Sequence, residues 1–168
     1  MGMRGVYIRT DDTTIANIKN GTQTINDTFG SLIWSWDEPN NNTVLHIDKT
    51  WDVIHYTLAG ERYDSSIDNP LSKVICSDPI SEEDMGMGPA TLISSDEVPI
   101  INNALKTVSK EWFREKFSHD DMRKKEIYCT DFIETNELFE YAYEYLEYIK
   151  EFFEQAAAEK QNILFFVN

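Results

Sequence analysis

The C-terminal part of the chain restricts the fold more than any other segment, because a long helical pattern there leads directly into an apolar run. Over residues 136–159, apolar side chains recur at spacings of three and four, as in a helix that buries one face; they are Leu138, Ala142, Tyr145, Leu146, Ile149, Phe152, Phe153 and Ala156. Gln161 and Asn162 end this pattern, and residues 163–167 are all apolar. Such a strand must be buried on both faces or paired at the centre of a sheet. The sequence therefore predicts a sheet with a long helix near it.

Capping residues and turn formers mark further elements in the first part of the chain. Residues 6–9 have the composition of a strand, and Thr10 or Asp11 offers an N-cap for a helix that ends at Asn20-Gly21. Residues 32–36 fit either a strand, by their β-propensity, or the end of a second short helix.

Similar patterns predict three short helices after residue 90. Residues 90–93 are a predicted strand, and Ser94 with Glu97 forms a capping box for the helix that follows it. Ser109 is expected to begin the next helix, and Ser118 the one after that.

These elements mix strands and helices without a regular alternation, which is typical of an α+β domain. We expect one domain over residues 1–168, with a mixed sheet, several short helices, the long C-terminal amphipathic helix and a final strand. Residues 37–42 and 77–89 are rich in turn formers and are predicted loops.

The charge of the chain bears on its partners. Thirty acidic and fifteen basic residues give a net charge of −15, which would repel phosphate backbones and anionic lipid headgroups. A field of this sign would instead attract a basic protein. The chain has no apolar stretch of about 20 residues and no secretory signal pattern at its start. We therefore expect a soluble cytoplasmic protein that binds neither nucleic acid nor membranes.

Sequence motifs of the common enzyme classes are missing. The chain has no Gly-x-Ser-x-Gly, His-Glu-x-x-His or Cys-x-x-Cys pattern, and Gly86 and Gly88 lack the lysine or third glycine of a nucleotide-binding loop. Cys76 and Cys129 are isolated thiols, expected to be reduced and structural. We predict no cofactor and no metal, and the missing motifs favour a protein that is not an enzyme.

One segment does concentrate residues suited to chemistry. A predicted strand at 44–47 leads into a predicted helix over 48–58, in which Asp48, Asp52 and His55 are spaced at i, i+4 and i+7 and so share one face. Two carboxylates and an imidazole could act as an acid–base pair or bind a divalent metal with a further ligand. The alternative is structural: a helix cap, a solvent-facing carboxylate and a half-buried histidine.

The long C-terminal helix has an acidic side as well as an apolar one. Glutamates recur there at spacings of three and four, at Glu137, Glu140, Glu144, Glu147, Glu151 and Glu154. Tyrosine beside acid suits the docking of an arginine- or lysine-rich surface. The predicted partner-binding residues are Glu140, Tyr141, Glu144, Glu147, Tyr148 and Glu151. The alternative is a solvated face without a partner.

Several short segments together resemble the YfbM-like family of small bacterial proteins; they are residues 1–5, 45–60, 88–92, 95–98 and 126–128. That family is a domain of unknown function, so the resemblance implies a fold and a bacterial source but no activity. The aspartate, tryptophan and histidine of 45–60 belong to the pattern, without an assigned role.

Three functions fit these observations. The first is a binding protein that docks a basic partner through its acidic surface, as an immunity-type inhibitor docks a toxin. The second is an enzyme of unfamiliar type, with or without a metal, that uses Asp48, Asp52 and His55. The third is a homo-oligomer that buries exposed aromatic residues such as Trp34 and Trp36. The enzyme hypothesis requires Asp52 and His55 to line an accessible pocket.

Overall fold

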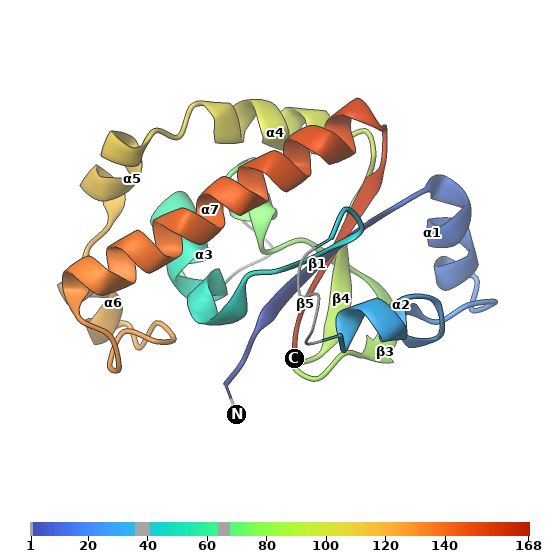
Figure 1. The fold of residues 1–168 in the computed structure, drawn as a ribbon, viewed down its shortest axis with the longest axis horizontal. Coiled ribbons are helices and arrows are strands. Elements are labelled where there is room, and N and C mark those ends of the chain that lie inside the picture. The colour runs from blue at the N-terminus through green and yellow to red at the C-terminus, as the bar shows by residue number, and fades with distance from the viewer. Residues whose placement is uncertain (1, 36–40, 64–67) are drawn as a thin grey trace.

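A five-stranded sheet forms the centre of the protein, and the last strand of the chain lies in its middle (Figure 1). The structure is a computed structural model that describes residues 2–35, 41–63 and 68–168. The strands are β1 (Gly5–Thr10), β2 (Val44–His46), β3 (Asp78–Asp84), β4 (Pro89–Ile93) and β5 (Asn162–Val167), in the order β2-β1-β5-β4-β3. The α+β prediction is confirmed, although the described pairings are all antiparallel and the sheet is not mixed.

Helices cover both faces of this sheet. The core on one face includes residues of α1 (Asp12–Lys19) and α2 (Ile25–Ile33). The other core includes residues of α3 (Trp51–Ala59), α4 (Val98–Lys106), α5 (Lys110–Lys116), α6 (His119–Lys124) and α7 (Thr135–Ala158). Figure 1 shows α7 crossing the molecule obliquely in front of the sheet. None of the helices in the described ranges is both long and apolar enough to cross a membrane.

Alternation along the two central strands explains why both sheet faces are covered. Tyr7 and Phe165 face the core beneath α7, whereas their neighbours Val6 and Phe166 face the core beneath α1 and α2. The Tyr7 ring lies 4.8 Å from that of Phe165 and 5.9 Å from that of Phe153 on α7, measured between centroids. These aromatic contacts fix α7 on the sheet, as the C-terminal pattern of the sequence predicts.

Most helix ends lie at the predicted caps. Asp11 caps α1 by accepting a hydrogen bond from the Thr14 amide at 2.8 Å, and Ser109 and Ser118 cap α5 and α6. Of the ambiguous segment at 32–36, Leu32 and Ile33 form the last turn of α2, while residue 36 lies outside the described residues.

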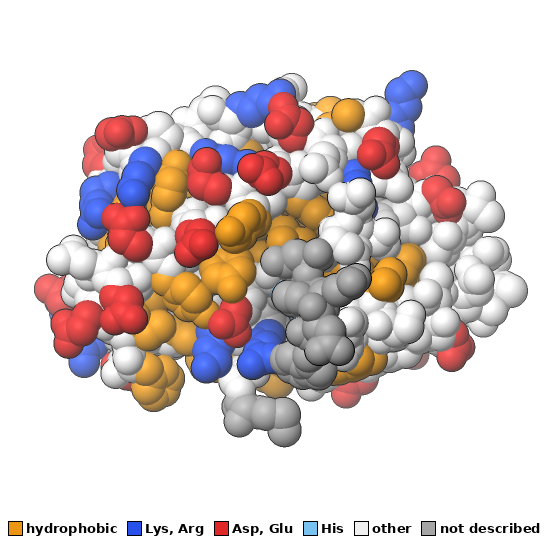
Figure 2. All heavy atoms as spheres, viewed as in Figure 1, with side chains coloured by type: hydrophobic (Ala, Val, Ile, Leu, Met, Phe, Trp, Pro, Cys, Tyr) orange, Lys and Arg blue, Asp and Glu red, His pale blue; other side chains and the backbone are white. Residues whose placement is uncertain are grey.

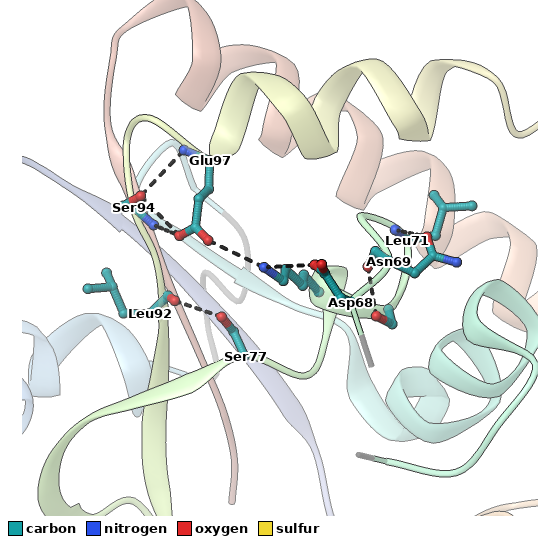
Figure 3. Close-up of polar contacts among 9 residues, drawn as sticks. Asp68, Asn69, Leu71, Ser77, Leu92, Ser94 and Glu97 are labelled. Atoms are coloured by element: carbon teal, nitrogen blue, oxygen red, sulfur yellow. Dashed lines mark hydrogen bonds and ion pairs between the residues drawn. The ribbon is translucent and has the colours of Figure 1, made fainter. Parts of the chain in front are cut away.

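The predicted capping box before α4 also forms, and it is joined to a neighbouring segment (Figure 3). The Glu97 carboxylate accepts hydrogen bonds from the amide and the hydroxyl of Ser94, at 3.1 and 3.0 Å. Lys73 lies between Glu97 and Asp68, with N···O distances of 3.6 and 3.8 Å. Burial alone would raise the pKa of Glu97, but the hydrogen bonds from Ser94 and the charge of Lys73 lower it. This cluster therefore fixes the start of α4.

The prediction of a loop over 77–89 is wrong, because residues 78–84 form the edge strand β3. Its composition concealed it, since Asp78, Glu82 and Asp84 are charged and point outward, as is common on edge strands. At its start, the Ser77 hydroxyl donates a hydrogen bond to the Leu92 carbonyl at 2.8 Å (Figure 3). Of the other predicted loop, only residues 41 and 42 are described, and they lie outside regular structure as predicted.

We expect Phe153→Ala to lower the free energy of unfolding by about 3 to 5 kcal/mol, because the buried ring would leave a cavity between α7 and the sheet. Phe132→Ala is the matched control, since that ring is 79% exposed and its loss should cost less than about 0.5 kcal/mol. Urea denaturation measures both values. Equal effects of the two substitutions would contradict the assigned core.

Candidate functional site

The segment that contains the three candidate catalytic residues starts differently from its prediction. Asp48 has a positive φ of 48° and begins a 3₁₀ turn over Asp48–Thr50, so α3 starts only at Trp51. Gly60 ends the helix as expected, in the left-handed conformation with φ 77°. The i, i+4, i+7 spacing from Asp48 therefore does not describe a single helix face.

Asp48 is tied to the N-terminus and to α7. Its carboxylate lies 3.3 Å from Nε of Arg4 and accepts a hydrogen bond from the Tyr141 hydroxyl. Burial and this hydrogen bond raise the pKa of Tyr141, so the phenol stays neutral and donates. Asp48 thus belongs to the surface formed by α7.

Asp52 has a structural partner instead. It is 8% exposed and accepts a hydrogen bond from the Tyr128 amide at 2.8 Å. Burial raises the pKa of Asp52, and the Tyr128 amide partly offsets that increase. This contact attaches the segment after α6 to the start of α3.

His55 is fully buried, and its ring centroid lies 5.6 Å from that of Tyr63. Burial lowers the pKa of His55, an effect that the backbone of Arg62 partly opposes. Neither ring nitrogen forms a hydrogen bond of good geometry with a described residue.

The three side chains thus have three separate environments, and Asp52 and His55 do not line the pocket beside Trp51. Within the described ranges, no group of three or more His, Cys, Asp or Glu side chains is arranged to hold a metal ion. The enzyme hypothesis requires Asp52 and His55 to line an accessible pocket, and this pocket does not meet that requirement.

His119 also has a role that its sequence context did not indicate. Its position beside Asp120 and Asp121 in the first turn of a helix predicts a surface residue. Instead the ring is 9% exposed and both nitrogens are engaged, with the Thr135 hydroxyl at 2.6 Å and the Thr130 carbonyl at 2.8 Å. His119 therefore connects α6 to the start of α7.

The acidic side of α7 divides into two rows. Glu140, Glu147 and Glu154, here the paired row, are all exposed and each contacts a cation of the same chain. Glu140 lies 2.7 Å from Lys110 and 3.3 Å from Arg114 of α5; Glu147 contacts Lys150 at 2.9 Å, and Glu154 contacts Lys106 at 3.8 Å. The charge of this row is therefore largely balanced within the molecule.

Glu137, Glu144 and Glu151 form the second row, here the open row. These carboxylates are exposed and form no ion pair with a described residue. The only described hydrogen bond of Glu144 comes from the Tyr148 hydroxyl at 3.3 Å. Their negative charge thus remains available to a partner.

Three tyrosines lie between these glutamates and complete what we call the acidic tyrosine surface. The rings of Tyr141, Tyr145 and Tyr148 meet edge to face, with centroid distances of 5.4 and 5.9 Å. Tyr148 is 41% exposed. Figure 2 shows hydrophobic side chains along this part of the molecule, bordered by acidic ones. The helical pattern predicts Tyr145 in the core, and Glu137 is not among the predicted partner-binding residues, although the spacing of both to Tyr141 and Glu144 places them on the same side.

A groove of about 320 Å³ extends the surface at the end of α7. Its walls include Tyr148, Glu151 and Gln155 on the helix, Leu45 within β2, and Asn41 shortly before that strand. Tyr148 and Glu151 thus belong both to the acidic tyrosine side of α7 and to this groove.

The buried histidine predicts a pH dependence of stability. Because the folded pKa of His55 is below 6.5, the unfolded chain binds a proton first as the pH falls, and stability is lost below about pH 6.5. We expect this loss to be smaller in His55→Leu, as measured by urea denaturation at successive pH values. His46, whose pKa burial also lowers, should leave a residual slope in the variant. Equal slopes in the two proteins would contradict the assignment.

Known proteins resemble this chain over most of its length. A family model described as a domain of unknown function (DUF1877) matches residues 1–166. Protein YfbM of Escherichia coli (strain K12) is 26% identical over 134 residues, or 76% of this chain and 74% of that protein. The crystal structure of YfbM from Escherichia coli, itself described as a protein of unknown function, has the same fold, with a TM-score of 0.77 and 22% identity over 98% of this chain and 99% of that one. The predicted resemblance is confirmed, and the chain belongs to the DUF1877 family.

Proposed function

We propose that this protein is a binding protein that docks a basic partner protein through the acidic tyrosine surface of α7. The main observation in support is the difference between the two glutamate rows. Cations of the chain itself contact the paired row, whereas the open row has no ion pair among the described residues and borders three tyrosines.

The charge of the whole chain supports the same partner chemistry. With a net charge of −15, the protein attracts cationic surfaces over a distance of about 10 Å at 0.1 M salt. Such fields raise association rates by about 10 to 1000-fold at low salt. The same charge disfavours nucleic acid and anionic membranes as partners.

The tyrosines supply contact area that charge alone does not. Tyrosine side chains are enriched among the residues that dominate binding energy, and arginine guanidinium groups stack on their rings. Asp48 holds the Tyr141 hydroxyl, and Tyr148 is hydrogen-bonded to Glu144. The rings are therefore held in place before a partner arrives, which reduces the entropy lost on binding.

The partner class that we propose is a basic toxin. An immunity-type inhibitor needs no catalytic group, because it acts by covering a cationic active site. We accordingly revise the docking residues from the set expected from sequence. Glu140 and Glu147 are removed because they already contact cations, and Glu137 and Tyr145 are added.

Two triple substitutions on α7 test this proposal. The open-row variant is Glu137→Gln/Glu144→Gln/Glu151→Gln, and its matched control is Glu140→Gln/Glu147→Gln/Glu154→Gln, which removes the same charge from the same helix. We expect the open-row variant to bind a labelled arginine-rich peptide at least about fivefold more weakly, and the control to change affinity less than about twofold. Fluorescence anisotropy at low and moderate salt measures both affinities.

The stability of the two variants should change in the opposite order. The control loses ion pairs and should be less stable by at most about 1 kcal/mol per pair, whereas the open-row variant should keep or gain stability.

An equal loss of peptide affinity in both variants would show binding by net charge alone and contradict the proposal. Failure of the unmodified protein to bind the peptide would contradict it as well.

A further inference from the structure

The groove at the end of α7 combines an aromatic ring with an unpaired carboxylate. Tyr148, which is 41% exposed, and Glu151 both line the groove. They are three residues apart in the helix, so their side chains are neighbours on one side of it. Glu151 is the one charged residue among the described residues that line the groove, and it forms no ion pair with a described residue. The groove is therefore suited to a cationic group.

Near its start, α7 already holds an arginine of this chain by a ring and a carboxylate. The guanidinium carbon of Arg114 lies 3.4 Å from the centroid of the Phe139 ring. The same guanidinium group lies 3.3 Å from the carboxylate of Glu140. Arg114 belongs to α5, so it approaches α7 from a separate segment, as an arginine of a partner protein would. This contact shows which cation such a ring and carboxylate of α7 hold.

A second arginine lies close to the groove without using its carboxylate. Arg9 is 5% exposed, donates a hydrogen bond to the Asn42 carbonyl, and lies 5.8 Å from the centroid of the Phe152 ring. Its ion pair is with Glu159, at 3.4 Å. Because Glu159 balances the charge of Arg9, the carboxylate in the groove keeps its charge for another cation.

We propose that this groove binds one arginine side chain of the basic partner, in preference to lysine. The inference rests on the proposed function, since it assigns one contact within the same docking surface. A guanidinium group is planar, so it can stack on the Tyr148 ring and direct N–H donors at the Glu151 carboxylate. Asn42 and Gln155 also line the groove, and their side-chain carbonyls are suited to accept the remaining N–H groups.

The preference follows from the difference between the two cations. A lysine ammonium group is a compact and strongly hydrated charge. It can pair with the Glu151 carboxylate, but it has no planar face to stack on Tyr148. The groove, at about 320 Å³, also has room for one long side chain, since a cavity of about 150 Å³ holds benzene.

Two labelled peptides of equal length and charge test this preference. One contains lysine as its only basic residue, and the other has a single arginine in place of the central lysine. We expect the arginine peptide to bind the unmodified protein about three- to tenfold more tightly, as measured by fluorescence anisotropy at low salt. Equal binding of the two peptides would overturn this inference and leave the proposed function in place. Binding of neither peptide would overturn both.

Substitutions then test whether the arginine lies in the groove. Glu151→Gln should abolish the preference, so that the two peptides bind with affinities within about twofold of each other. Glu137→Gln is the matched control, because it removes one charge of the open row outside the groove. It should weaken the binding of both peptides by similar factors and keep the preference.

The aromatic ring is tested in the same way. Tyr148→Leu removes the ring and should abolish the preference, whereas Tyr148→Phe keeps the ring and should keep it. Survival of the preference in Glu151→Gln or Tyr148→Leu, or its loss in Glu137→Gln or Tyr148→Phe, would overturn the assignment.

Discussion

The packing of α7 on the central strands through Tyr7, Phe153 and Phe165 determines the rest of the arrangement. Because these rings are buried, the apolar side of α7 faces the sheet at Phe153, and nearer the start of the helix Phe139 packs on Phe113 of α5. The glutamates and tyrosines on the other sides of the helix must then lie at the surface. One flank meets the lysines and arginine of α4 and α5, and the other borders the 3₁₀ turn at Asp48 and the groove beside β2. The six glutamates of α7 look equivalent in the sequence, but in the folded protein the two flanks of the helix have different surroundings.

The elements that the sequence predicted well are those with local causes. Helical periodicity, serine and aspartate caps and the glycine after α3 act within a few residues, so they are readable from the sequence. The edge strand β3 was missed because its outward positions are charged, and its pairing with β4 depends on a partner strand. Asp48 was placed in the helix because its left-handed backbone conformation has no strong sequence marker.

The candidate sites show the same division between local and tertiary causes. The sequence identifies Asp52 and His55 as candidates by residue type and spacing. It does not show that the Tyr128 amide donates a hydrogen bond to Asp52, or that His55 lies buried against Tyr63. The sequence predicts one acidic surface on α7, because its six glutamates recur at spacings of three and four along the helix. The pairing of Glu140 and Glu154 depends on Lys106, Lys110 and Arg114, which precede α7 in the chain and meet it only after folding. Glu147 instead pairs with Lys150 of the same helix.

Photo-crosslinking in a lysate of the native bacterium, at low and at raised salt, tests the central proposal most directly, with p-benzoylphenylalanine placed at Tyr148 in one protein and at Trp34 in another. Tyr148 lies on the acidic tyrosine surface, and Trp34 is similarly exposed at the C-cap of α2. The account predicts that a basic protein is crosslinked at position 148 but not at position 34, with a yield that falls as salt is raised. Crosslinking of the same protein at both positions, of a second copy of this chain, or of no basic protein at position 148 would contradict it.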